Sequence, residues 1–141
     1  ANFTFVGRPN GGDAIILNTG TNAVYANGVV TGSIGCLDMD DATTRGAFNS
    51  VLFACLTAFR DDADAAGANA FNAGANNNAN YTPTLTNTFI NGANETAATP
   101  VANLAAISAF FTQVPYVGAV RNAADTWYAG WTCGLPGGTA C

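Results

Sequence analysis

Carboxylates are the side chains with the widest chemical scope in this sequence, because it contains no histidine and no lysine. Their absence excludes Ser–His and Cys–His nucleophiles, histidine metal sites, Schiff bases and phosphate-binding loops with a G-K-[ST] motif. The acidic residues include two clusters, Asp38, Asp40 and Asp41, and Asp61, Asp62 and Asp64. A calcium site or a glycosidase pair is the functional alternative, but neither cluster follows the twelve-residue calcium-loop pattern. We interpret both clusters as solvated loop acids, with Asp41 or Thr43 capping a turn, and expect no catalytic residue, metal or cofactor.

Positive charge is too sparse in this chain for binding to nucleic acid. Four arginines stand against nine acidic residues, which gives a formal net charge of −5. Phosphate backbones and anionic lipids are bound by clustered Lys and Arg, so we expect no partner of either kind. No apolar run approaches the roughly 20 residues that a bilayer-spanning helix needs. A surface this poor in charge favours self-association, because the copies repel one another weakly.

Four cysteines offer either a metal site or two disulfides. No pair has C-x-x-C spacing, and a zinc site would need all four thiolates from distant segments. An even number of cysteines in this lysine-free, Asn-rich chain favours disulfides and an oxidising compartment. Three pairings are possible, and we favour Cys36–Cys55 with Cys133–Cys141 because each joins the nearest neighbours in sequence.

Aromatic residues near the end of the chain form the next candidate site. Trp127, Tyr128 and Trp131 can stack on the apolar faces of sugars, but such residues more often seal the end of a core. We interpret them as an aromatic cap, with glycans as a possible partner. The sequence also holds three N-x-[ST] motifs, which are glycosylation acceptors only in a host with that machinery: Asn2, Asn80 and Asn94.

Internal repeats are the most informative feature of the sequence. Four segments begin with Asn, continue through β-branched or aromatic residues and end in a small residue or Gly: Asn2–Gly7, Asn27–Gly32, Asn49–Ala54 and Asn87–Gly92. The first three start 25 and 22 residues apart, and Asp13–Asn18 and Gly35–Asp40 are also 22 residues apart. Short strands repeated at this period, between Gly, Asn and Asp, are typical of stacked coils.

The repeats predict a mainly β fold, a short right-handed parallel β-helix of about four coils. Each coil would pair with its neighbours at about 4.8 Å and stack Val, Ile, Leu and Phe into one core. One C-terminal helix and the aromatic cap would cover the end. The alternative is a small α+β or β-sandwich domain made of unrelated strands.

We expect a single domain, 1–141, with coils at 1–56 and 84–92, an Ala/Asn/Gly-rich insertion at 57–83, and a helix and cap at 99–141. Helical and strand spacing compete in Thr43–Phe59, and the repeat register favours a strand at Asn49–Phe53. Thr99 followed by Pro100 predicts a helix start, so we expect a helix over 100–112. Because the chain begins at Ala1 without Met, we expect a removed leader or a longer parent sequence.

The C-terminal region contains two aromatic and glycine motifs, Tyr116–Val120 and Asp125–Gly134. They resemble the end of a group of largely uncharacterised secreted bacterial proteins with a Y-x-G-A…W-x-x-G-W-T segment. Three other stretches resemble the same group, Asn2–Gly7, Cys36–Ala42 with Asn49–Cys55, and Thr86–Thr96. The resemblance implies an exported location and a parallel β-helix, and it implies no catalytic residues. This chain is shorter than the members of the group.

Polysaccharide lyases also use β-helical folds, so an enzyme has to be considered. A lyase needs an Arg or Lys base beside calcium, and only Arg60 and, more loosely, Arg45 lie near an acidic cluster. We therefore predict that the protein is not an enzyme.

The N-terminal segment suggests how the protein works. Asn2, Phe3, Thr4, Phe5, Val6 and Gly7 form a first strand with no covering segment before it in this sequence. We expect this strand to add to another copy, or the coil ends to stack head to tail, in a filament or surface assembly outside the cell. The alternative is a carbohydrate-binding or adhesive module that uses the aromatic cap.

Overall fold

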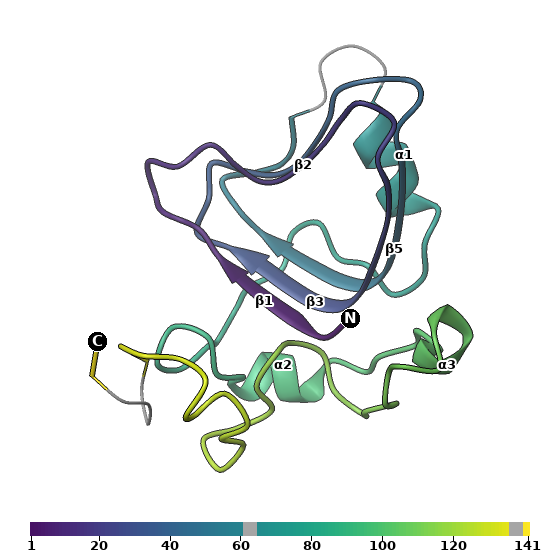
Figure 1. Ribbon diagram of the computed structural model, residues 1–141. Helices are drawn as coiled ribbons and strands as arrows, with labels where there is room; N and C mark the ends of the chain where they lie inside the picture. Colours follow the sequence, from purple (N-terminus) through teal and green to yellow (C-terminus); the bar gives the residue numbers. More distant parts are fainter. Residues whose placement is uncertain (61–64, 136–139) are drawn as a thin grey trace.

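The computed structural model describes residues 1–60, 65–135 and 140–141, and these ranges contain six strands and three short helices (Figure 1). The acidic residues Asp61, Asp62 and Asp64 lie outside the described residues. The strands occupy the first half of the chain, and the second half contains two of the helices and several isolated bridges.

The first sheet is parallel, with the order β1 (Phe3–Val6), β3 (Asn22–Thr31) and β5 (Arg45–Ala54). Phe3 is opposite Gly28, and Gly28 is opposite Val51, so three of the repeated segments pair side by side. The strand expected at Asn49–Phe53 is confirmed as part of β5.

The second sheet is also parallel, with the order β2 (Asp13–Leu17), β4 (Gly35–Met39) and β6 (Thr57–Phe59). Ile15 lies opposite Leu37, and Leu37 lies opposite Phe59. Each strand of this sheet follows one strand of the first sheet along the chain, so the two sheets grow in the same direction.

The prediction of a four-coil β-helix is wrong. The strands form two separate three-stranded parallel sheets that do not close into coils. The expected fourth coil at Asn87–Gly92 contains no strand, and Ile90 makes only isolated bridges, to Thr86 and Val120. The backbone of Asn87 and Thr88 has positive φ, 47° and 78°, which bends this segment away from an extended conformation. The alternative of a small α+β domain is loosely compatible with this arrangement.

The main core lies between the two sheets. Ile15, Leu37 and Met39 from the second sheet meet Val30, Val51 and Phe53 from the first. Helix α1 (Ala66–Asn72) adds the buried ring of Phe71, whose centroid lies 4.4 Å from that of Phe53. Because aromatic side chains bury a large area, this contact holds α1 against the end of the core.

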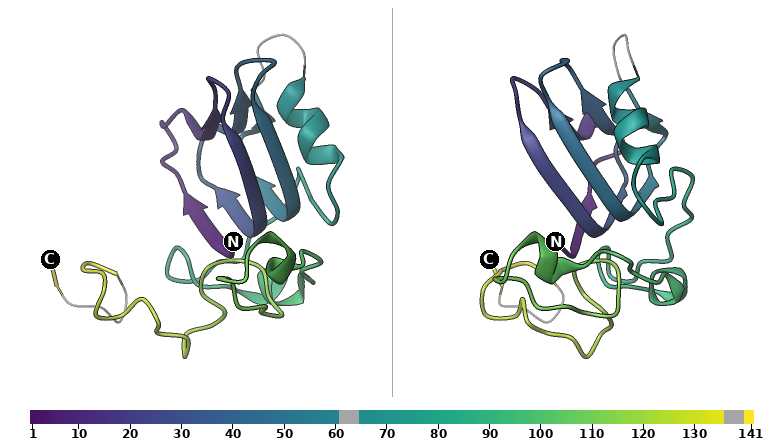
Figure 2. Two further views of the ribbon diagram at one scale, coloured as in Figure 1. Left: turned by 45° about the vertical axis from the view of Figure 1, so that its right-hand side comes forward. Right: turned by 90° about the vertical axis from the view of Figure 1, so that its right-hand side faces the viewer.

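The second half of the chain covers the other face of the β1–β3–β5 sheet (Figure 2). Val29 and Leu52 point away from the main core and pack with Val117. The helices here are short, α2 (Ala93–Ala97) and α3 (Leu104–Ile107). The helix expected over 100–112 is therefore wrong in length, because Ser108 returns to an extended backbone after a single turn.

Candidate functional site

Strands β1 and β2 are both edge strands, each the first of its sheet. The Asn2 backbone N–H donates to the Ala26 carbonyl, 2.9 Å away, and β1 pairs with β3 from there to Val6. Successive backbone groups of a strand point to alternate sides. Counted back from the Gly7 N–H, which donates to the Thr31 carbonyl of β3 at 2.7 Å, the N–H groups of Thr4 and Val6 are directed away from β3, toward the unpaired side of β1. The positive φ of Asn2, 47°, breaks the alternation before Phe3.

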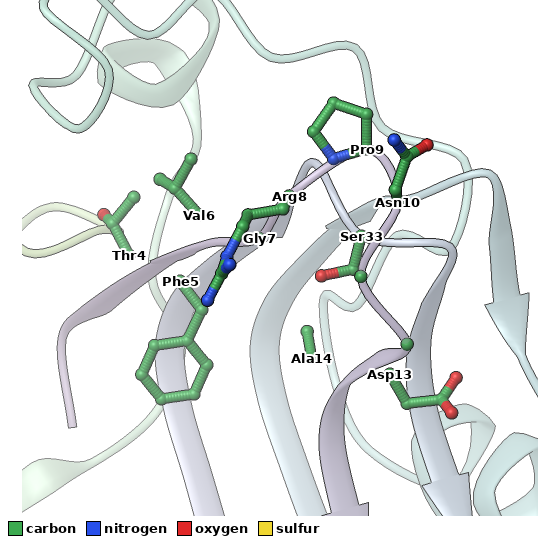
Figure 3. A pocket seen from close by; sticks show the side chains of 12 residues that line it. Thr4, Phe5, Val6, Gly7, Arg8, Pro9, Asn10, Asp13, Ala14 and Ser33 are labelled. Carbon is green, nitrogen blue, oxygen red and sulfur yellow. The ribbon is translucent and has the colours of Figure 1, made fainter.

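A cavity of about 880 Å³ opens where these two edges meet (Figure 3). It is lined by β1, by the 7–12 loop, by the start of β2 and by Ser33. Figure 3 shows Thr4, Phe5 and Val6 on one side of the opening and Asp13 and Ala14 on the other. The cavity therefore belongs to both sheet edges at once.

The open edges are apolar. Phe5 is 39%, Val6 43% and Ile16 55% exposed, and the Phe5 ring lies 4.7 Å from that of Phe3. Natural edge strands are usually protected by lysine, proline or a bulge. Strand β1 carries no charge, and the single charge of β2 is Asp13, which lies 3.4 Å from the Arg60 guanidinium.

The opposite edge of the first sheet, along β5, is already paired. The Ser50 N–H donates to the Ala75 carbonyl at 2.8 Å, and the Asn78 N–H donates to the Val51 carbonyl at 3.0 Å. The Asn77 side chain accepts from the Val51 N–H at 2.9 Å and donates to the Phe71 carbonyl at 2.7 Å. The segment 75–81 thus satisfies the edge that β5 would otherwise expose.

On its outer face, β1 is tied to the second half of the chain. The Asn2 side-chain amide donates to the Tyr116 carbonyl at 2.8 Å, and the Thr4 hydroxyl accepts from the Ala119 N–H at 3.0 Å. These bonds hold β1 in place from one face and leave its free edge unpaired. The strand is thus presented as a fixed template and not as a loose terminus.

An apolar pocket of about 350 Å³ lies on this outer face, beside Val6. The predicted aromatic cap contributes to it unequally. Tyr128 is buried against Ile90 and Val120, whereas Trp127 is mostly exposed and Trp131 is 88% exposed. The Trp127 indole N–H donates to the Ala119 carbonyl at 3.0 Å, which fixes its ring beside the pocket.

Both favoured disulfides are present, Cys36–Cys55 and Cys133–Cys141. The first joins β4 to the end of β5 and so links the two sheets across the core. Disulfides persist in oxidising compartments, so the pair is consistent with an extracellular protein.

The three N-x-[ST] motifs differ in their accessibility to modification. The amide groups of Asn2 and Asn94 donate to backbone carbonyls, of Tyr116 at 2.8 Å and of Thr82 at 2.9 Å. The Asn80 side chain is exposed, and its own backbone N–H is the group that bonds to Asn78. Asn80 is therefore the motif that a glycan could occupy without breaking those two bonds.

Asp41 closes a turn, as its sequence context suggested. Its carboxylate accepts from the Thr43 hydroxyl, from the Thr44 N–H at 3.0 Å and from the Thr19 N–H. The hydroxyl bond from Thr43 is the main reason that the pKa of Asp41 lies well below its ordinary value. In the described ranges, no group of three or more His, Cys, Asp or Glu side chains is placed to hold a metal ion.

Glu95 is a buried carboxylate that the sequence reading missed. It accepts from the Tyr81 hydroxyl at 3.0 Å, the Thr84 N–H and hydroxyl at 2.9 Å each, and the Gly92 N–H at 2.9 Å. Burial by itself would raise the pKa of Glu95, but these donors hold it below its ordinary value. The spacing Gly92-x-x-Glu95 is the signal that could have revealed it, because an acid at this position of a helix start often bonds back to the first N–H.

No protein-family model, curated protein or solved structure matches this chain. The likeness of its C-terminal motifs to secreted bacterial proteins therefore stays a prediction. None of the helices within the described residues has the length and apolar character needed to cross a membrane.

We expect the substitution Glu95→Gln to destabilise the protein by about 1–3 kcal/mol at neutral pH, because an amide cannot accept from all four donors. A carboxylate with a lowered pKa stabilises the fold above its unfolded-state pKa, and this contribution is lost as the pH falls through the folded-state pKa. Urea unfolding between pH 3 and pH 7 measures both effects. The difference in the free energy of unfolding between wild type and variant should become smaller as the pH falls. A difference that stays constant across this range would contradict the role of Glu95.

Proposed function

We propose that this protein is a structural subunit of an extracellular assembly, and that it binds other copies of itself through the open edges of β1 and β2. The observation that carries the proposal is the contrast between the two edges of the first sheet. The β5 edge is paired with 75–81, while the β1 edge is uncharged and partly exposed. Hydrogen bonds on the outer face of β1, such as that from the Ala119 N–H to Thr4, hold the strand in place.

Strand addition is the mode of binding that suits such an edge. An added strand satisfies backbone N–H and C=O groups and needs no particular side-chain chemistry. The exposed Phe5, Val6 and Ile16 side chains would lose water on association, which supplies a favourable free energy. A site of this kind calls for a polypeptide partner and for no cofactor.

The composition supports a durable subunit that works outside the cell. Two disulfides link segments of the fold, and the low charge density keeps repulsion between copies small. A place at the cell surface or in an extracellular fibre would suit both properties. The predicted head-to-tail stacking finds less support than strand addition, because 75–81 and α1 occupy the far end of the first sheet.

The exposed tryptophans favour a second candidate function, carbohydrate binding. Trp127 is exposed and lines an apolar pocket, Trp131 is exposed four residues farther along the chain, and aromatic rings stack on neutral sugars. On a glycan array, this function predicts signals that a Trp127→Ala, Trp131→Ala double variant loses by at least tenfold. An array without signal for the wild-type protein, or one on which the double variant binds equally well, would exclude it.

For self-association, we expect Val6→Lys to weaken binding between copies by at least tenfold, because a lysine on the edge strand opposes strand addition. Sedimentation velocity over a hundredfold range of protein concentration measures the effect. Leu56→Lys is the matched control, since Leu56 is 85% exposed in the turn between β5 and β6, away from the β1 edge.

A wild-type protein that stays monomeric at every concentration would refute the proposed function. So would a parent sequence in which residues before Ala1 pair with β1, because the edge would then be filled within the chain. Equal association of the two lysine variants would also refute it, since the edge would then play no part in binding.

A further inference from the structure

We infer that two copies meet edge to edge around a two-fold axis and form a closed dimer, in which β1 pairs with β1 and β2 pairs with β2 of the partner copy. This inference rests on the proposed function, since it specifies how copies use the open edges. It differs from the filament expected from the sequence, because a two-fold contact uses up the open edges of both copies.

The first argument is that, within the described residues, the far edge of the first sheet is covered while its β1 edge is open. A filament needs two different surfaces that fit each other. The far end of the first sheet is filled, because Ser50 and Phe53 donate to carbonyls of the 75–81 segment and Phe71 covers the core. For the first sheet, the open β1 edge therefore finds its matching partner in the β1 edge of a second copy.

The second argument is that both edges can pair at the same time. The β1–β3–β5 and β2–β4–β6 sheets grow in the same direction and flank one cavity. A two-fold axis perpendicular to the common growth direction would set each edge strand against its own copy, with the two copies running in roughly opposite directions. Antiparallel neighbours exchange N–H and C=O bonds reciprocally, so two identical edges satisfy each other. The result would be two continuous six-stranded sheets.

The third argument concerns charge. The whole chain carries a net charge of −5, so two copies repel each other wherever acidic surfaces meet. Strand β1 has no charged residue, and Asp13 of β2 already faces Arg60 at 3.4 Å. Pairing at this end would therefore bury no unpaired charge from either strand.

The C-terminal segment agrees with a partner at this end. Figure 2 shows this segment, drawn in yellow, reaching past β1 on the side away from α1. It carries Trp131, which is 88% exposed, and Leu135, which is partly exposed. A second copy at the β1 edge would lie beside this segment and give these side chains an apolar neighbour.

Spin labels on single introduced cysteines test the symmetry. All four native cysteines are in disulfides, so Ile16→Cys and Asn72→Cys each provide one thiol for a nitroxide. Ile16 is exposed near the middle of β2, and Asn72 is exposed at the end of α1, at the far end of the molecule. Dipolar EPR on each variant then gives the distance between identical sites in the assembly.

A two-fold dimer places the Asn72 labels at least about 20 Å farther apart than the Ile16 labels, because two strand spacings separate the open edge from the far edge in each copy. The mass by light scattering should be that of two chains and should not increase further. Head-to-tail growth would give similar distances for both sites and a mass that rises with concentration, which would overturn the two-fold arrangement while leaving self-association intact. A wild-type protein without any association would instead remove the proposed function itself.

Discussion

Backbone hydrogen bonds between parallel strands are the interaction on which this structure depends. Strands that lie 22 to 25 residues apart in sequence pair in register, and this pairing lets both sheets grow in one direction. A parallel sheet leaves unpaired N–H and C=O groups along its two outer strands. Whether the backbone groups of each outer strand are paired within the chain therefore decides whether that edge can bind another polypeptide.

The β5 edge of the first sheet is covered by several specific contacts. Asn77 bonds to the backbone of β5 and of α1, and Phe71 closes the core behind it. Farther along the chain, the Glu95 carboxylate accepts hydrogen bonds from Tyr81, Thr84 and Gly92. These bonds hold the segment that follows 75–81 in place. The other edge receives no such cover within the described residues, although Asn2 and Thr4 hold β1 rigidly in place. The contrast between the covered β5 edge and the open β1 edge is the basis for proposing a partner chain.

Local signals in the sequence predicted the strands and their pairing partners well. The repeated segments that begin at Asn2, Asn27 and Asn49 pair side by side in the structure. The cysteines nearest in sequence form the two disulfides. The closed β-helix did not follow, because a repeat specifies which strands pair but not whether the sheets join into a coil. Asn87–Gly92 shares the repeat composition, but two residues with positive φ turn it into a bend. The open edge could be anticipated from β1, whereas the cover supplied by Asn77 and Glu95 could not, because it depends on contacts between distant segments.

Hydrogen exchange at the amides of Thr4 and Val6 tests the central claim most directly, since these two groups point away from β3. The account predicts rapid exchange in dilute protein and at least tenfold slower exchange at high concentration, with the amides of Val29 and Val30 inside the sheet unchanged. Amides of Thr4 and Val6 that are already protected in the dilute monomer, or that exchange equally fast at every concentration, would contradict it.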